Sequence, residues 1–499
     1  MKNFDLARYS YDVICDGKPS DTVVTFEQSG DALSVFVTAH ADRPQFVTVR
    51  WPFETDEDLY VLSDVWERSY GNLGFFRLSA ISGTMPWYFA ATDKTETYCF
   101  GVETQPNAFV GFTYDRSGIT ARIDCRNGGG GVKLGGRTVK LCTFVFAHYN
   151  LPPYQSLCAY CKRLCATPLL PKGKIYGGNN WYYAYGESSF QDNVSDAKLQ
   201  AEAARGIENK PFMVIDDGWE LDGFLGPYEP NEKYGDMKAL AEQIKSLGVR
   251  PGIWARLLDN QEPDITSDMR ILRGGERIYL DPTDARVQSL VVGYIRKMRS
   301  WGFELLKHDF STYDLFGDFG AKLTDSITNY TGWHFADETK TNAEIVLDFY
   351  RLILDACGDM LVLGCNTVSH LSAGLVHINR TGDDTSGRDW AQTRKMGVNT
   401  LAFRLAQNNA FYVVDADCVG ILGDNIPWEK NRQWMDLLSK SDTALFLSCG
   451  SLNETQAADV RKAFLEIQKD HEIEPLDIYD NLTPEKWLID GQVAQYDWS

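Results

Sequence analysis

The feature that most constrains this chain is an alternation of short apolar runs with amphipathic segments along residues 174–469. Helical periodicity separates most of the runs, as in 194–205, 237–247, 285–300, 342–356, 389–406, 429–439 and 455–469. Such alternation predicts a parallel sheet covered by helices, in the α/β class. Eight runs favour a (β/α)8 TIM barrel over the alternative, an open doubly wound sheet. The runs are 174–183, 211–219, 250–257, 303–310, 360–366, 375–381, 410–417 and 443–449.

The rest of the chain predicts three further parts. Residues 1–148 hold short alternating runs separated by turn residues, which is typical of an N-terminal antiparallel β-sandwich. Residues 149–172 predict a linker helix before the barrel of 173–470, and 471–499 predict a short C-terminal β extension packed on the barrel. The weakest part of the barrel is the connection 368–373, which is too short for a full helix.

Composition excludes several classes of partner. The net charge of −20 opposes binding to nucleic acid or to an anionic membrane. No basic start with an apolar core opens the chain, and no apolar run has membrane-spanning length, so we expect a cytoplasmic protein. The 11 cysteines are irregularly spaced, which predicts reduced thiols. Cys158, Cys161 and Cys165 have helical spacing, which favours a buried helix face over a metal site.

Polar side chains gather at the ends of the predicted strands. In a barrel the C-terminal strand ends form one face, where ligands bind. Buried carboxylates are costly unless they are paired or used, so packing alone does not explain this concentration. The strand ends carry Asn179, Asn180, Trp181, Asp216, Asp217, Trp219, Trp254, Arg256, Lys307, Asp309, Cys365, Asn366, Arg380, Asp383, Asp384, Asp415 and Asp417.

Two chemistries suit such a face. Divalent-metal catalysis commonly uses a His-x-His pair, which the sequence lacks, so we expect neither a metal ion nor an organic cofactor. Glycoside hydrolysis needs two carboxyl groups and aromatic walls for the sugar ring, which these residues supply. Side chains alternate along a strand, so Lys307 and Asp309 share a side, and the lysine favours the ionised form of the carboxylate.

Three motifs in this order resemble those of glycoside hydrolase family 36 α-galactosidases, with family 27 more distant. They are residues 216–219 (Asp-Asp-Gly-Trp), 307–309 (Lys-x-Asp) and 380–385 (Arg-Thr-Gly-Asp-Asp-Thr), and the likeness extends to 64–71 and 280–282. The resemblance implies a retaining mechanism with Asp309 as the nucleophile and Asp383 as the acid/base. Alignment to family 27 moves the second role to Asp384.

The resemblance also implies how the sugar is held. Asp216 and Asp217 bind the 4- and 6-hydroxyl groups, Lys307 the 3-hydroxyl and Arg380 the 2-hydroxyl region. Trp181 and Trp254 wall the ring. Further substrate contacts are expected from Trp219, Asn366 and Asp384.

Departures from the family pattern leave the substrate open. His308 replaces an aromatic residue of the nucleophile motif, residues 365–368 (Cys-Asn-Thr-Val) replace the stretch near the 2-substituent, and Arg256 replaces an acidic residue. We therefore predict an α-galactosidase acting on small oligosaccharides. The alternatives are an α-N-acetylgalactosaminidase, another α-glycosidase or transglycosylase, an enzyme for an acidic sugar paired to Arg256, a metal-dependent hydrolase, or a non-catalytic sugar-binding protein. The oligomeric state stays open, a homo-oligomer included.

Overall fold

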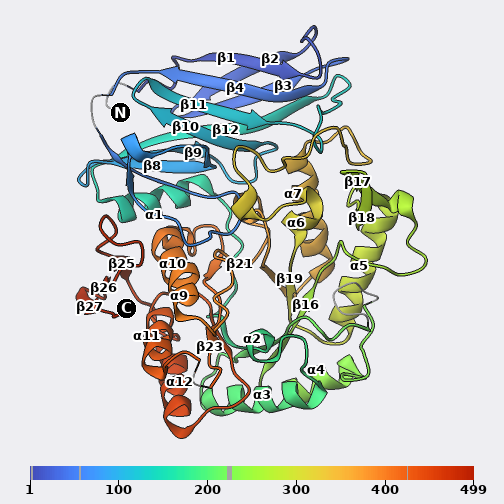
Figure 1. Cartoon of the computed structure of the whole chain (residues 1–499), viewed down its shortest axis with the longest axis vertical. Helices are drawn as coiled ribbons and strands as arrows, with labels where there is room; N and C mark the ends of the chain where they lie inside the picture. The colour runs from blue at the N-terminus through green and yellow to red at the C-terminus, as the bar shows by residue number, and fades with distance from the viewer. Residues whose placement is uncertain (2–3, 56–57, 222–227, 424) are drawn as a thin grey trace.

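The computed structural model describes residues 1, 4–55, 58–221, 228–423 and 425–499, and its N-terminal part consists of two antiparallel sheets (Figure 1). The five-stranded sheet has the order β1 (Ser10–Cys15), β4 (Pro44–Pro52), β11 (Gly118–Asp124), β10 (Phe109–Asp115) and β7 (Met85–Pro86). The seven-stranded sheet has the order β2 (Val23–Ser29), β3 (Ala32–Thr38), β12 (Thr138–Tyr149), β9 (Thr97–Val102), β8 (Tyr88–Thr92), β5 (Tyr60–Ser63) and β6 (Phe76–Arg77).

The two antiparallel sheets face each other across aromatic side chains. Strand β3 buries every second residue, because alternate side chains point to the same face of a strand. Trp51 on β4 contacts Phe100 on β9 and Phe144 on β12 edge-to-face, at centroid distances of 5.1 and 5.0 Å. The N-terminal part is therefore a sandwich with its own aromatic core, as predicted.

Among the described residues, the main sheet has nine parallel strands. Their order is β22 (Val413–Asp415), β21 (Ile378–Arg380), β20 (Leu361–Gly364), β19 (Leu305–His308), β16 (Arg250–Ala255), β14 (Phe212–Ile215), β13 (Tyr176–Asn179), β24 (Leu445–Ser448) and β23 (Val419–Gly420). All eight predicted runs contribute a strand, each shorter than its run.

The prediction of a closed barrel is correct only in part. Within the described residues, the ladder of paired strands does not join β22 to β23 or β24. The run 410–417 continues past β22 into a turn at Asp417, which has a φ of 75°, and the chain resumes as β23 beside β24. The Ala444 N–H donates to the Val414 carbonyl at 2.9 Å, so the two ends of the sheet approach each other. The sheet is therefore curved, but its strand pairing does not close into a barrel.

Helices connect most of these strands, and three of them begin with a capping box, at Ser189, Thr341 and Asn453. The predicted helix 389–406 is divided by a π-helical turn, Arg394–Val398, and the end of the first predicted strand is instead the short helix α2. The helices are α1 (Pro153–Leu164), α2 (Trp181–Ala184), α3 (Phe190–Ala203), α4 (Met237–Ser246), α5 (Ala285–Ser300), α6 (Ser311–Phe316), α7 (Asn342–Cys357), α8 (Ser369–Ser372), α9 (Trp390–Thr393), α10 (Asn399–Arg404), α11 (Trp428–Ser439) and α12 (Glu454–Glu466).

Two small sheets are also present in the described part of the chain. Strands β17 (Arg270–Arg273) and β18 (Glu276–Leu280) form a hairpin beside α5 (Figure 1). Strands β25 (Ile473–Pro475), β26 (Lys486–Ile489) and β27 (Gln492–Gln495) form the predicted C-terminal extension. The indole N–H of Trp390 donates to the Trp498 carbonyl at 3.0 Å, which fastens the end of the chain to α9.

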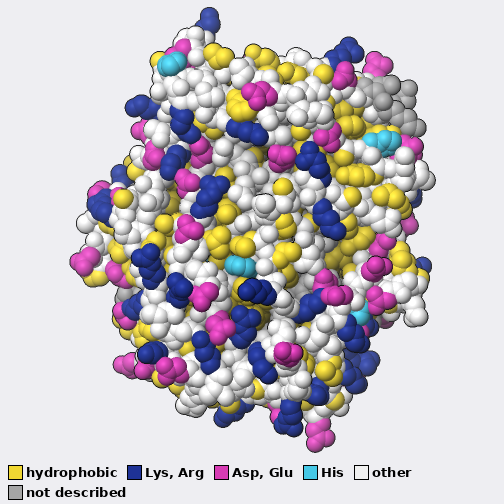
Figure 2. Space-filling model, turned by 180° about the vertical axis from the view of Figure 1, so that it is seen from behind, with side chains coloured by type: hydrophobic (Ala, Val, Ile, Leu, Met, Phe, Trp, Pro, Cys, Tyr) yellow, Lys and Arg dark blue, Asp and Glu magenta, His cyan; other side chains and the backbone are white. Residues whose placement is uncertain are grey.

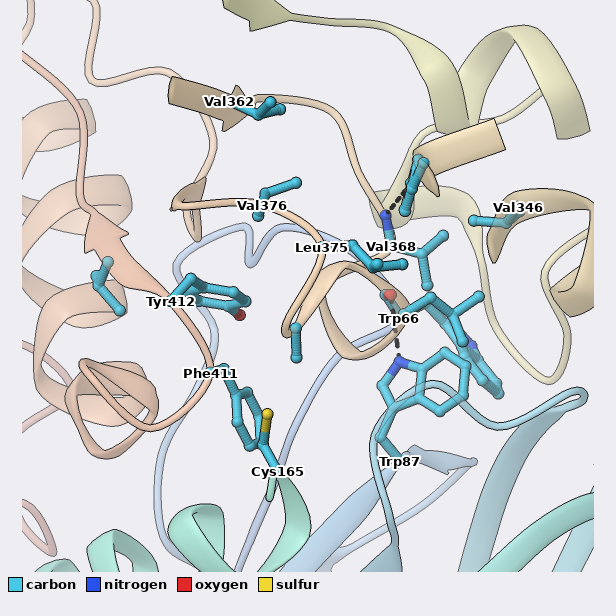
Figure 3. Close-up of a cluster of buried hydrophobic side chains, with 14 of the residues drawn as sticks. Trp66, Trp87, Cys165, Val346, Val362, Val368, Leu375, Val376, Phe411 and Tyr412 are labelled. Atoms are coloured by element: carbon cyan, nitrogen blue, oxygen red, sulfur yellow. Dashed lines mark hydrogen bonds between the residues drawn. The ribbon is translucent and has the colours of Figure 1, made fainter. Parts of the chain in front are cut away.

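The antiparallel sheets dock on the parallel sheet through a hydrophobic cluster (Figure 3). Trp66 and Trp87 from the N-terminal part lie close to Val368, and the indole N–H of Trp87 donates to the Trp66 carbonyl at 3.3 Å. Trp87 also stacks on His370 at a centroid distance of 5.0 Å. This buried contact fixes the loop that follows Trp66 against the strand ends of the parallel sheet.

The surface carries charges of both signs. Figure 2 shows the face opposite to that of Figure 1, where Lys and Arg side chains are interspersed with Asp and Glu. Across the described part of the chain, none of the helices has the length and apolar character needed to cross a bilayer.

Candidate active site

A cavity of about 520 Å³ opens at the C-terminal ends of the parallel strands. All the predicted site residues except Trp219 and Asn366 line it. A larger hollow of about 1290 Å³ lies at the opposite ends of the strands, where Lys174 pairs with Asp442 and Asp470. The smaller cavity is lined by Arg68, Tyr70, Asn179, Trp181, Tyr182, Asp216, Asp217, Trp254, Lys307, Asp309, Phe310, Phe319, Ala321, Lys322, Cys365, Arg380, Asp383, Asp384, Asp417 and Cys418.

Asp309 directly follows β19 and is held at both carboxylate oxygens. The indole N–H of Trp254 donates to Oδ2 at 3.2 Å, and the backbone N–H of Phe310 donates to Oδ1 at 2.7 Å. Phe310 has a φ of 62°, a left-handed conformation that is unusual for this residue type. Burial alone would raise the pKa of Asp309, but Lys307 and Arg68 lower it below its ordinary value. The side chain is thus kept ionised.

Lys307 lies between Asp309 and Asp216, which follows β14, two strands away from β19 in the sheet. Its Nζ contacts Oδ2 of Asp216 at 2.6 Å, and both side chains are buried. The same oxygen accepts a hydrogen bond from the Asn179 side chain at 2.6 Å. Burial favours the neutral amine, but the charges of Asp216 and Asp309 raise the pKa of Lys307 well above its ordinary value. A fixed cation therefore lies at the base of the cavity.

Asp217 has a different environment from Asp216. Burial and the negative charge of Asp216 raise its pKa to about 7. Its Oδ1 is buried without a hydrogen-bond partner among the described residues. Glu220 lies nearby, and burial together with Asp217 raises its pKa well above the usual range. An unsatisfied buried oxygen in the wall of a cavity is a natural acceptor for a ligand hydroxyl group.

Asp383 and Asp384 follow β21 on a loop that contacts the N-terminal part of the chain. Arg68 Nη2 lies 3.1 Å from Asp383 Oδ1, and Arg68 Nη1 lies 3.6 Å from Asp384 Oδ1. The side chain of Asp383 is 26% exposed, against 44% for Asp384. Burial raises the pKa of Asp384 although Arg380 lies 3.0 Å away. Both carboxylates line the cavity, and Asp383 is the more enclosed of the two.

Arg380 is fixed by a buried network. Its Nη2 contacts Oδ2 of Asp417 at 2.5 Å, and the Tyr182 hydroxyl donates to the same oxygen. The backbone N–H of Thr385 also donates to Oδ2 of Asp417, at 2.7 Å. Arg380 lowers the pKa of Asp417 against the effect of burial. Asp417 thus holds both Arg380 and the loop that carries Asp383.

Three residues with a predicted substrate contact lie outside the cavity lining, namely Trp219, Asn366 and Arg256. Trp219 is fully buried, and its indole N–H donates to the Trp254 carbonyl at 3.0 Å. Asn366 is also fully buried, and its side-chain amide donates to Glu67. Neither lines the cavity, because the chain turns away after the short strands β14 and β20. Arg256 pairs with Asp314 at 2.7 Å and with Asp259 at 3.3 Å. Because Arg256 also lies outside the cavity lining, the structure does not support binding of an acidic sugar to this residue. His308 is buried, as alternation predicts, and burial lowers its pKa to about 4.

Several cavity residues were not identified from the sequence as site residues. Arg68 and Tyr70 come from the N-terminal part, and Phe319 comes from the loop after α6. The segment 64–71 resembles family 36, but nothing in the sequence indicates that Arg68 reaches the strand ends. Cys365 and Cys418 add two free thiols to the wall.

This arrangement suits transfer chemistry at a sugar carbon. An ionised carboxylate, a second carboxylate beside a guanidinium and two aromatic walls surround one hollow. The described residues contain no group of three or more His, Cys, Asp or Glu side chains that could hold a metal ion.

The fold is that of the glycoside hydrolase family 36 α-galactosidases, although sequence identity to them is low. The α-galactosidase TtGalA from Thermus thermophilus, solved with p-nitrophenyl α-D-galactopyranoside, is 17% identical and has a TM-score of 0.63, covering 98% of this chain and 99% of its own. The galactosidase domain of the α-galactosidase-sucrose kinase AgaSK is 14% identical, with a TM-score of 0.59 and 96% and 75% coverage.

A third solved structure, the family 36 α-galactosidase AgaA from Geobacillus stearothermophilus, is 14% identical, with a TM-score of 0.56 and 92% and 73% coverage. No protein-family model matches the sequence, and no curated protein matches it either.

Proposed function

We propose that this protein is a retaining α-glycosidase, most directly an α-galactosidase, that acts on small oligosaccharides with a terminal α-galactosyl group. The observation that carries the proposal is the pairing of two unlike carboxyl groups, Asp309 and Asp383, on one cavity. Asp309 is held ionised by Lys307 and Arg68, whereas Asp383 contacts the Arg68 guanidinium on the same cavity and is 26% exposed.

The proposed reaction has two displacements. Asp309 attacks the anomeric carbon while the glycosidic C–O bond breaks, and Asp383 gives its proton to the departing oxygen. Asp383 then takes a proton from water, which attacks the same carbon and releases Asp309 from the glycosyl-enzyme. Two inversions give net retention, which requires the two carboxyl groups to lie about 5–5.5 Å apart.

The other cavity residues fit the recognition of one sugar ring. Asp216 and Asp217 are proposed to accept hydrogen bonds from the 4- and 6-hydroxyl groups, Lys307 to donate to the 3-hydroxyl, and Arg380 to contact the 2-hydroxyl region. Trp181 and Trp254 provide the walls, and both line the cavity. TtGalA has been crystallised with a nitrophenyl galactoside and with stachyose, which supports a galactoside as the substrate.

A panel of aryl α-glycosides tests the proposal. We expect hydrolysis of the α-galactoside, α-galactose as the first product by NMR, and loss of turnover in Asp309→Asn with sugar binding kept. Asp259→Asn is the matched control, because this buried carboxylate pairs with Arg256 outside the cavity. Preference for the α-N-acetylgalactosaminide would replace the substrate assignment. Binding without hydrolysis of any glycoside in the panel would refute the enzyme.

A further inference from the structure

We propose that Arg68, supplied by the N-terminal sheets, is the positioning residue of the acid/base Asp383. This inference rests on the proposed function and deepens it. It makes the N-terminal part of the chain a component of the active site, and not only a packing partner of the parallel sheet.

Arg68 acts as a clamp, by which we mean that its guanidinium contacts three carboxylates at once. One guanidinium lies 3.1 Å from Asp383, 3.6 Å from Asp384 and 3.2 Å from Glu67, measured between the closest nitrogen and oxygen atoms. Only 10% of the Arg68 side chain is exposed. A planar guanidinium fixes the direction of the carboxylates it contacts, which a flexible ammonium group does not do.

Glu67 holds the Arg68 guanidinium in place through its buried carboxylate. Its side chain is completely buried, and it accepts hydrogen bonds from the Gly320 N–H at 2.6 Å and from the Asn366 amide. Burial raises the pKa of Glu67 to about 7, although Arg68 opposes this effect. A carboxylate at this position stops the guanidinium from turning away from Asp383, and Gly320 ties it to the loop that carries Phe319 in the cavity wall.

The backbone of the same segment is fastened to the acid/base loop. The Ser69 N–H donates to the Thr381 carbonyl at 2.8 Å, and the Asp383 N–H donates to the Ser69 carbonyl at 2.9 Å. Arg404 then bridges the carbonyls of Glu67 and Thr381, at 2.9 and 2.8 Å. The backbone at Asp383 and the guanidinium that contacts its carboxylate therefore move as one unit.

The chemistry explains why such a clamp matters. The acid/base must lose its proton to the leaving group and regain one from water, so it alternates between neutral and ionised forms. Arg68 fixes the direction of the Asp383 carboxyl group at the cavity that would hold the glycosidic oxygen. Asp383 interacts electrostatically with Arg68, Glu67 and Tyr70 from the N-terminal segment and with Asp384 on its own loop. The other charged residues that line the same cavity are Asp216, Asp217, Lys307, Asp309, Lys322, Arg380 and Asp417.

The test compares two leaving groups. A nitrophenyl group departs with little help, whereas methoxide from methyl α-galactoside requires the proton. In Arg68→Met we expect kcat/KM for the methyl galactoside to fall about 100-fold, at the lower end of a general-acid contribution, and that for the nitrophenyl galactoside to fall less than about tenfold. Azide, which attacks the glycosyl-enzyme without a base, should raise kcat of the variant on the nitrophenyl substrate and yield α-galactosyl azide, with no increase in the wild type.

The control is Arg126→Met. Arg126 is also a buried arginine of the N-terminal part, it pairs with Asp124 at 2.6 Å, and it does not line the cavity. We expect it to lower the free energy of unfolding in urea without changing the ratio of the two kcat/KM values. If Arg68→Met does not fold, Arg68→Lys decides in its place, because a single ammonium cannot hold both carboxylates and should change the ratio in the same direction.

Equal losses on the two substrates, or an absence of azide rescue, would overturn the role of Arg68 while leaving the proposed function intact. An inactive wild type would overturn the proposed function, and the role of Arg68 with it.

Discussion

Lys307 is the buried cation that contacts Asp216 and that lowers the pKa of Asp309. The substitution Lys307→Met removes this cation. The ion pair between Lys307 and Asp216 measures 2.6 Å, with side-chain exposures of 9% and 4%. Removal of one partner of such a buried pair costs about 3–5 kcal/mol, because the other charge stays buried. Asp216 keeps the hydrogen bond from Asn179, so we expect a value near the lower end of this range.

The effect on catalysis follows from the sign of the interaction. Without the lysine the pKa of Asp309 rises, so the acid limb of the kcat/KM profile moves to higher pH. Loss of one charged hydrogen bond to the sugar would add about 1.5–3 kcal/mol, or roughly a 10- to 150-fold fall in kcat/KM at the optimum.

Urea denaturation and kcat/KM measured from acid to neutral pH check the two expectations separately. Lys174→Met is the control, since this lysine forms its ion pairs at the opposite ends of the strands, is 22% exposed, and should leave the pH profile unchanged. An acid limb at the wild-type position in Lys307→Met would refute the electrostatic account of Asp309, whatever the change in stability.

Two further expectations concern single carboxyl groups. Asp383→Asn should lower kcat/KM for unactivated galactosides about 10²–10⁴-fold in a steady-state assay. Asp384→Asn loses the 3.0 Å ion pair with Arg380 and should lower kcat/KM about tenfold or less in the same assay. The reverse order would move the acid/base role to Asp384. Burial raises the pKa of Asp196 to about 7, so the native carboxyl binds its proton more tightly than the unfolded one, and stability falls as pH rises from about 4 to about 7. The stability difference between Asp196→Asn and the wild type, measured by urea denaturation, should therefore grow in favour of the variant across this window, by on the order of 4 kcal/mol. A constant difference would contradict the assignment.

Strand periodicity predicted much of the framework because it is a local property. The run 303–310 contains β19, and alternation correctly separates Lys307 from His308, which is buried away from the cavity lining. Local pattern fails where a strand ends. Trp219 lies four residues beyond β14, where the chain has already turned into the core, so its expected contact with the sugar does not follow from strand geometry.

The sequence did not predict contacts between distant segments. Arg68 reaches Asp383 only because the cluster around Trp66 docks the N-terminal sheets on the parallel sheet (Figure 3). The turn at Asp417 likewise ends β22, because its carboxylate is bound by Arg380 and Thr385 from another strand end. The single predicted run 410–417 shows no sign of that break.

The identity of the nucleophile is the central claim, and covalent trapping tests it most directly. A fluorinated α-galactosyl fluoride that forms the glycosyl-enzyme but hydrolyses slowly should add one sugar per chain, and peptide mass spectrometry should locate it on Asp309. The Asp309→Asn protein should remain unlabelled under the same conditions. A label on any other residue of an active wild-type enzyme would contradict the account.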